Sequence, residues 1–241
     1  MGIIFNSQKL GTPENKYVLW VDIMGIKEKM SRSLWQSANF ICKFHSAVSE
    51  SILDGVTVYP VMDGAYVTFD DSDEVVAKIK KFISNVFSKL LWEFSAEKEF
   101  EHRFMVRGGL AYGPIYPGSR LTKDVVPLFY DKSEGLLLGF PVVQANVCES
   151  YAPPFGVCLH DSVLAKASEA GCHIAFSGKW YHWEKELPKE ILKSFKAKMS
   201  QHYGDCENHK SEIGYKEESL KKHHAWANEF WGLYKRGKNG K

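Results

Sequence analysis

Two aspartates stand out because of the residues around them. Asp22 interrupts an apolar, β-forming run at residues 17–23 (YVLWVDI), and Asp63 precedes Gly64 between two β-rich arms in residues 56–69 (VTVYPVMDGAYVTF). A carboxylate that is buried alone costs several kcal/mol, so an acid in such a strand needs a cation. Two converging carboxylates suit Mg²⁺ or Mn²⁺, and these ions in turn suit a triphosphate.

Each aspartate also has a simpler explanation. An Asp at a hairpin tip favours the turn itself, and an Asp at the end of a strand caps the backbone that follows. The metal-site interpretation therefore depends on a fold that brings the two side chains together.

The elements between residues 17 and 112 predict such a fold. We expect, in order, a buried strand at 17–23, a helix at 28–54, a hairpin at 56–69 with its tip at Asp63, a helix that begins at Ser72, and a strand at 103–112. Gly108 and Gly109 in the last strand mark a place where a backbone or a ligand can approach closely.

The resulting βαββαβ order is that of the α+β, ferredoxin-like fold, an antiparallel sheet with both helices on one face and the other face free. The first and third strands of this fold usually lie side by side, which brings Asp22 towards the Asp63 hairpin. We expect four further elements to extend it: a helix at 142–151, a strand at 156–159, a helix at 161–169 and a strand at 173–176.

The character of the chain changes at Trp180, where an aromatic segment leads into charged helices that begin at Pro188 and near Glu217. We therefore expect one catalytic domain at residues 1–179 and a C-terminal helical extension at residues 180–241.

The composition of the chain limits the kinds of partner that it is expected to bind. A net charge of +2 and a pI near 8.1 lack the basic excess that binding to a nucleic-acid backbone needs. The sequence has no apolar run of about 18 residues and no leader-like start, which predicts a cytoplasmic protein without membrane insertion. Five cysteines without CxxC spacing fit reduced thiols.

Four segments together resemble the class III nucleotidyl cyclases. VDIMGIKEK is similar to the strand motif D-I-x-G-F, PVMDGAYVTF to the hairpin motif around a second metal aspartate, and FMVRGGLAYGPIY to the strand R-x-G-I-x-x-G. LLLGFPVVQANVCES resembles a divergent form of the helix G-x-x-V-N-x-A-x-R-x-E. The resemblance covers residues 17–151 in the family's order, and it implies a ferredoxin-like core extended as a class III cyclase catalytic domain.

Carried over by position, the resemblance implies that Asp22 and Asp63 hold two Mn²⁺ or Mg²⁺ ions, with the backbone carbonyl of Ile23 as a further ligand. It implies two-metal catalysis in which the ribose 3′-hydroxyl attacks the α-phosphorus and pyrophosphate leaves. No covalent enzyme intermediate is required.

The chain departs from the purine cyclases at two places. Val143 and Val147 take the positions of the family's transition-state Asn and Arg, and a shift of one residue brings Gln144 and Cys148 there, which restores neither. Four residues before Asp63, where purine cyclases carry a base-reading Lys, the chain has Tyr59.

Tyr59 and the RGG-containing layout of 241 residues resemble the bacterial Pycsar antiphage cyclases, which make cyclic UMP or cyclic CMP. The resemblance implies UTP as the favoured substrate and a homodimer with interfacial sites. Each site would combine the metal aspartates of one subunit with Tyr59 of the other. It also implies a separate membrane effector that senses the cyclic nucleotide in antiviral defence.

Both substrate-binding candidates have alternatives. Tyr59 suits a cross-strand aromatic position in a hairpin as well as it suits base reading. Arg107 suits contact with phosphates, and it equally suits an ion pair with a local acid.

Three other functions stay open beside a uridylate cyclase. They are a cytidylate or purine cyclase, a non-catalytic cyclase-homology module that binds nucleotide or dimerises, and an unrelated ferredoxin-like interaction domain that uses its C-terminal aromatic helix. The two aspartates argue against the non-catalytic module, because a decayed site has no physical reason to keep two converging carboxylates.

Overall fold

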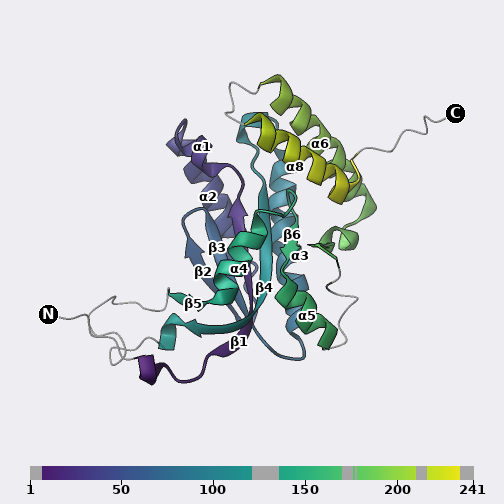
Figure 1. Ribbon diagram of the computed structural model, residues 1–241. Helices are drawn as coiled ribbons and strands as arrows, with labels where there is room; N and C mark the ends of the chain where they lie inside the picture. The colour runs from purple at the N-terminus through teal and green to yellow at the C-terminus, as the bar shows by residue number, and fades with distance from the viewer. Residues whose placement is uncertain (1–6, 121–135, 170–175, 177, 210–215, 234–241) are drawn as a thin grey trace.

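Strand β1 (Glu14–Ile23) lies between two antiparallel neighbours, β3 (Gly64–Asp70) and β4 (Val106–Pro117). The structure is a computed structural model that describes residues 7–120, 136–169, 176, 178–209 and 216–233. Within these residues the sheet has seven strands in the order β2-β3-β1-β4-β6-β7, with β5 paired to β4 (Figure 1). The other strands are β2 (Val56–Val61), β5 (Leu137–Gly139), β6 (Val157–Leu159) and β7 (Trp180–Tyr181).

The predicted strand pairing is confirmed. The first and third strands are adjacent, and Asp22 lies opposite Gly64 on β3 and opposite Arg107 on β4. Strand β6 extends the sheet by pairing in parallel with β4. The strand predicted at 173–176 lies outside the described residues except for Phe176.

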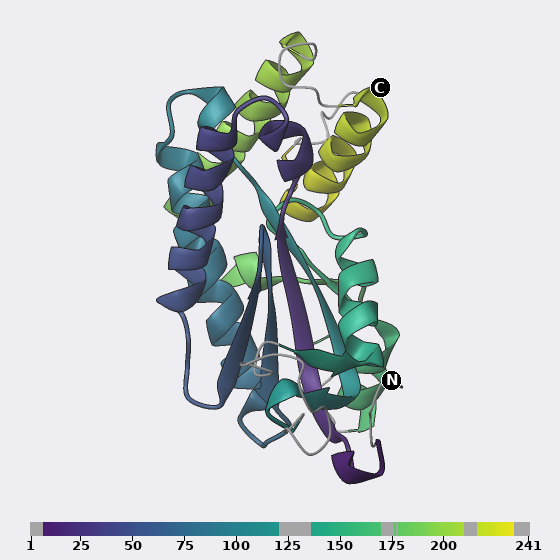
Figure 2. The same cartoon turned by 90° about the vertical axis from the view of Figure 1, so that its left-hand side faces the viewer.

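Two long helices, α2 (Leu34–Ser49) and α3 (Val75–Ala96), cover one face of the sheet, as predicted (Figure 2). The residues of β1 that face them, among them Leu19 and Val21, are buried in the main core. Alternate residues of the strand point to the opposite face, so Trp20 and Asp22 lie there.

The prediction of one helix at 28–54 is wrong in one respect, because the structure has two helices in this region. α1 (Ile26–Met30) ends before Ser33, whose hydroxyl accepts a hydrogen bond from the backbone N of Gln36 (3.3 Å) at the start of α2. Such a side-chain cap starts a new helix, although the apolar spacing continues across the break.

The opposite face of the sheet is not free, contrary to the prediction. Helix α4 (Phe140–Glu149) packs over β4 and β1, and its Ala145 joins a second buried cluster with Val18 and Trp20. A Cβ at Gly109 would lie 2.1 Å from the carbonyl oxygen of Ala145. The close approach predicted at Gly109 is therefore made by the backbone of α4.

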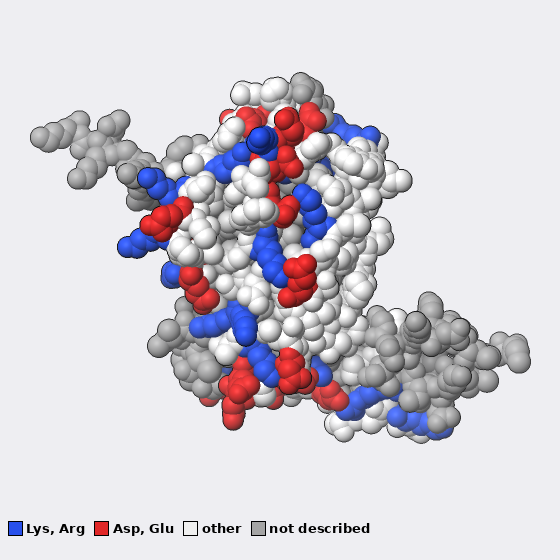
Figure 3. Space-filling view, turned by 180° about the vertical axis from the view of Figure 1, so that it is seen from behind, with Lys and Arg blue, Asp and Glu red and all other residues white. Residues whose placement is uncertain are grey.

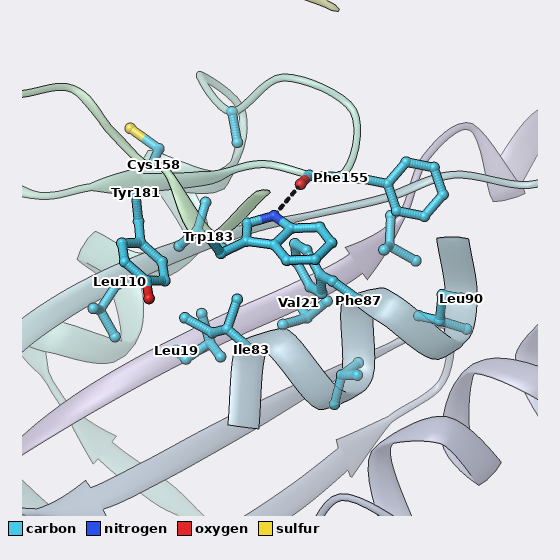
Figure 4. Close-up of a cluster of buried hydrophobic side chains, with 14 of the residues drawn as sticks. Leu19, Val21, Ile83, Phe87, Leu90, Leu110, Phe155, Cys158, Tyr181 and Trp183 are labelled. Atoms are coloured by element: carbon cyan, nitrogen blue, oxygen red, sulfur yellow. Dashed lines mark hydrogen bonds between the residues drawn. The ribbon is translucent and has the colours of Figure 1, made fainter. Parts of the chain in front are cut away.

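The segment after Trp180 completes the core. Figure 4 shows the indole of Trp183 among side chains of β1, α3 and β4, with its Nε1 donating to the carbonyl of Phe155 (2.7 Å). Trp231, at the end of the chain's last described helix, donates in the same way to Pro154 (2.9 Å). The division at residues 179 and 180 stays a prediction, while the side chains on both sides of it share one core.

The remaining helices complete the molecule. They are α5 (Asp161–Glu169), α6 (Lys189–Asn208) and α8 (Glu217–Trp231), with short 3-10 turns at Ser7–Leu10, Phe100–His102, Gly118–Arg120 and Trp183–Glu186. None of the described helices is long and apolar enough to cross a membrane. On the face drawn in Figure 3, acidic and basic side chains are interspersed, so this face offers no continuous basic track for a nucleic-acid backbone.

The packing of α4 on β4 predicts a large difference between two glycine substitutions. Gly109→Ala forces its new methyl group against the α4 backbone, so we expect a loss of roughly 2–4 kcal/mol in the free energy of unfolding. Gly204→Ala is the matched control, because a Cβ there meets nothing within 4 Å in the interior of α6, and we expect a gain of roughly 0.5–1 kcal/mol. Urea denaturation measures both, and equal effects would contradict the close helix packing.

Candidate active site

Asp22 is the penultimate residue of β1, and its half-buried side chain lies on the sheet face that carries α4. This position places it between the β2–β3 hairpin on one side and Arg107 of β4 on the other. The central place of β1 in the sheet therefore gives Asp22 neighbours from two other strands.

Asp63 lies in the two-residue loop of the β2–β3 hairpin, since Val61 pairs with Gly64. The predicted tip is confirmed. The other loop residue, Met62, has a φ of 41°, a conformation that costs free energy for a residue other than glycine.

Two hydrogen bonds hold this strained tip in place. The backbone N of Ile23 donates to the Asp63 carbonyl (3.2 Å), and Nε2 of His45 on α2 donates to the Met62 carbonyl (2.8 Å). The tip is therefore tied both to the end of β1 and to the helix layer, which fixes Asp63 beside Asp22.

The electrostatics of Asp22 are unfavourable without a cation. Burial, with the nearby carboxylates of Glu149 and Asp63, raises the pKa of its carboxyl group to about 7, although Arg107 acts in the opposite direction. When these groups are ionised, the three carboxylates outnumber the two cations that act on them, Arg107 on Asp22 and Glu149, and Lys222 on Glu149. A divalent cation would offset the remaining negative charge.

The oxygen atoms available at this site are of the kind that Mg²⁺ and Mn²⁺ usually bind. Asp22 and Asp63 offer carboxylate oxygens, and Ile23 between the two segments offers a backbone carbonyl. No group of three or more His, Cys, Asp or Glu side chains with metal-binding geometry exists in the described part of the chain. Mg²⁺ sites commonly use one or two carboxylates and complete their shell with water and substrate phosphates.

Arg107 forms an ion pair through its Nε with Oε1 of Glu149, a buried residue at the end of α4. Its Nη1 lies 3.4 Å from Nε2 of His223 on α8. Burial, with the nearby charges of Arg107 and Lys222, lowers the pKa of His223 to about 4, so the imidazole is neutral at pH 7 and its Nε2 accepts from the guanidinium. The expected pairing of Arg107 with an acid is present, while its contact with phosphates stays a prediction.

Tyr59 lies on the same sheet face as Asp22 but away from it, opposite Tyr66 on the hairpin. Its side chain is 6% exposed and hydrogen-bonds with Thr68, and burial raises the pKa of its phenol. Within one chain Tyr59 therefore acts as a cross-strand aromatic. A role at the site of a second subunit stays a prediction.

Val143 and Val147, the residues at the family's Asn and Arg positions, lie on the outer side of α4 and are 58% and 54% exposed. The residues of the shifted register do not replace them, because Cys148 is buried against Cys158 with the two Sγ atoms 2.8 Å apart. Among the described residues, α4 therefore carries no basic side chain that could reach Asp22.

Known structures identify the fold. No protein-family profile matches the chain, and no curated protein matches it. A bacterial light-regulated adenylyl cyclase matches with a TM-score of 0.50 and 17% identity over 65% of this chain and 80% of that chain. The chain has the fold of a nucleotidyl cyclase catalytic domain.

Two further structures with this cyclase fold are similar. A second structure of a bacterial light-regulated adenylyl cyclase has a TM-score of 0.50 and 15% identity, over 63% of this chain and 44% of that chain. The monomeric guanylyl cyclase domain of the RhoGC fusion protein from the aquatic fungus Blastocladiella emersonii has a TM-score of 0.46 and 14% identity, over 65% and 86%. The predicted α+β fold class is confirmed.

The structure brings two residues to the site that the sequence analysis did not select, Glu149 beside Asp22 and His223 beside Arg107. Glu149 is the final acid of the divergent G-x-x-V-N-x-A-x-R-x-E segment, so its place in that motif was a usable signal. His223 lies in the C-terminal extension, 116 residues after its partner Arg107, and no local pattern marks it.

The raised pKa of Asp22 predicts a pH dependence of stability in metal-free buffer. The folded chain holds the carboxyl proton of Asp22 more tightly than the unfolded chain does, because the pKa of this Asp is near 3.8 in the unfolded chain. Ionisation of Asp22 should therefore lower the free energy of unfolding as the pH rises from about 4 to about 7. Asp22→Asn removes this contribution, so at pH 8 the free energy of unfolding of the variant should exceed that of wild type by on the order of 4 kcal/mol.

Urea denaturation of both proteins with a chelator present measures that difference across the pH range. Asp54→Asn, an exposed substitution in the turn before β2, is the control and should follow wild type. If the free energies of unfolding of wild type and Asp22→Asn differed by the same amount from pH 4 to pH 8, the raised pKa of Asp22 in the folded chain would be contradicted.

Proposed function

We propose that this protein is a metal-dependent nucleotidyl cyclase that converts UTP to 3′,5′-cyclic UMP and pyrophosphate. The observation that carries the proposal is the excess of negative charge at the end of β1, where Asp22, Asp63 and Glu149 outnumber the cations Arg107 and Lys222. The cyclase fold supports it, because this charge lies at the strand end and hairpin that the class III motifs occupy.

The chain's own residues would prepare the reaction by position and charge. When bound, two divalent ions would supply the Lewis acidity that lowers the pKa of the ribose 3′-hydroxyl and steadies the leaving pyrophosphate. Asp22, Asp63 and the Ile23 carbonyl would hold them, and the tied hairpin tip keeps Asp63 from moving away. Arg107 is placed one strand across from Asp22, where its guanidinium can meet a phosphate oxygen.

The finer parts of the proposal rest on the resemblance to the Pycsar cyclases. They are the pyrimidine base, with CTP or a purine triphosphate as the alternative, a cytoplasmic signal in antiviral defence, and a separate membrane effector. The structure gives one supporting feature for the homodimer: Phe140, Val143, Val147 and Tyr151 form an exposed apolar stripe along α4, on the sheet face of Asp22.

A non-catalytic nucleotide-binding module is the second candidate, and one observation favours it. Val143 and Val147 are exposed and apolar, so the charge that develops at the α-phosphorus has no α4 partner from this chain. Loss of such a partner typically costs several kcal/mol of transition-state stabilisation.

An assay with each of ATP, GTP, CTP and UTP in the presence of Mn²⁺ distinguishes the candidates. We expect a single cyclic pyrimidine product by chromatography, and a loss of roughly 10³-fold or more in Asp22→Asn and Asp63→Asn, because each removes a metal ligand. Asp54→Asn should keep full activity. Cyclic AMP as the sole product would overturn the pyrimidine assignment, and full turnover by either site variant would overturn the metal assignment.

The role of Tyr59 is tested by removing only its hydroxyl. If Tyr59 of one subunit reads the base in the other, Tyr59→Phe should raise KM for UTP by roughly tenfold, since a lost hydrogen bond to substrate costs about 1 kcal/mol or more. Tyr112→Phe is the matched control, because its hydroxyl bonds to Asp71 (2.6 Å) at the other end of the sheet. Equal kinetics for the two variants would leave Tyr59 as a packing residue.

A further inference from the structure

A cavity of about 230 Å³ lies where the C-terminal extension closes on the core. Residues around the start of α1 and of β4, including Met24 and Met105, form one wall, and residues of α6 and α8 form the other. Figures 1 and 2 both place α6 and α8 at the end of the sheet where β1 runs into α1. Since a cavity of about 150 Å³ holds benzene, this one has room for a larger flat ring system.

The lining carries an excess of positive charge, with Lys29, Arg103 and Lys216 against the single carboxylate of Glu28. Its two imidazoles, His202 and His223, add no charge at pH 7, because burial lowers the pKa of His202 to about 3 and that of His223 to about 4. An anion therefore suits this cavity better than a neutral or cationic molecule.

Two cations of the lining, the buried Arg103 and the partly buried Lys29, differ in how they are satisfied. Arg103 meets Asp205 (3.3 Å) and donates to the carbonyls of Glu97 and Lys98. Lys29 donates to the backbone oxygen of Glu101 (2.9 Å), and no described carboxylate lies within 4.0 Å of its ammonium group. Lys29 is thus the cation of the lining that an incoming anion can still neutralise.

His202 supplies a second, independent sign of a missing ligand. It is 6% exposed, and its Nδ1 has no hydrogen-bond partner among the described residues. Its Nε2 lies 3.4 Å from Sγ of Cys206, whose pKa burial raises to about 12, so the thiol is protonated and can donate to Nε2. The remaining proton of the neutral imidazole then lies on Nδ1, a fully buried donor that a ligand oxygen in the cavity can reach once the ring turns towards it.

We propose that this cavity binds a small, flat organic anion, in its simplest form an aromatic carboxylate, whose ring packs on Phe104 and Met105 and whose carboxylate meets Lys29 and His202. The cavity is next to the catalytic residues without containing them. Met24 directly follows Ile23, and His223 lines the cavity while it contacts Arg107. An occupant therefore touches the two segments that hold the site residues of β1 and β4.

Isothermal titration calorimetry of the full chain with 2-naphthoate, without nucleotide or metal, tests the proposal. We expect saturable binding at one site per chain. Lys29→Met should weaken it by roughly tenfold or more, because a charge-assisted hydrogen bond is lost, while the neutral isostere 2-naphthylmethanol should bind wild type and Lys29→Met equally. Ser219→Trp should fill the cavity from α8 and abolish binding of both probes.

Lys81→Met, an exposed substitution on α3 outside the lining, is the matched control and should bind as wild type does. Absence of saturable binding to wild type, or equal binding to Ser219→Trp, would overturn the proposal. Displacement of 2-naphthoate by UTP with Mn²⁺ at a constant total number of sites would also overturn it, since the probe would then occupy the nucleotide site. Because binding is read without turnover, its outcome is independent of whether the protein is a cyclase.

Discussion

The burial of Asp22 at the end of β1 is the constraint on which the site depends. A carboxylate in this place has protein neighbours on both flanking strands and is only partly exposed to water. Asp63 and Glu149 add negative charge, and Arg107 is the cation that acts on Asp22 from within the chain. With a pKa of about 7, protonation relieves only part of this charge at neutral pH. The cation that the proposed reaction needs would therefore also stabilise the fold.

Small residues in the neighbouring strands allow this arrangement. A Cβ at Gly64 would lie 2.4 Å from the indole of Trp20, so the absence of a side chain there lets the hairpin pair closely with β1 beside Trp20. On the other side, Gly109 lies opposite Trp20 and admits the backbone of α4. Because α4 approaches so closely, its last residue, Glu149, reaches Arg107 and enters the charge balance of Asp22. Two glycines thus determine which acids surround the central strand.

Much of the fold could be predicted from the sequence because its signals are local. The apolar run that ends at Asp22, the Asp63 hairpin and the helical spacing of α3 each depend on a few neighbouring residues, and together they give the strand order. The Ser33 cap was also a local signal, since Gln36 follows it by three residues, but continuous apolar spacing concealed the break.

The rest of the site depends on contacts between distant parts of the chain. Arg107 meets Glu149 across 42 residues and His223 across 116, and both pairings require the packing of α4 and α8. The glycine pair in β4 did predict a close approach, but the sequence could not distinguish a ligand from the backbone that makes it. Local pattern therefore identified the two aspartates that are proposed to bind metal, and an acidic partner for Arg107 as one alternative, but not which acid that partner is.

The ion pair between Arg107 and Glu149 orients the guanidinium without occupying all of its hydrogen-bond donors. Glu149 is bound through Nε and His223 through Nη1, so within the described residues Nη2 keeps its donors for a phosphate oxygen. His223 stays neutral at pH 7 and does not repel the guanidinium, which a protonated imidazole would do. The nearby carboxylate nevertheless offsets part of the positive charge. In the proposed reaction Arg107 would therefore be a well-oriented but electrostatically weakened phosphate partner, and the greater share of charge stabilisation would fall to ions held by Asp22 and Asp63.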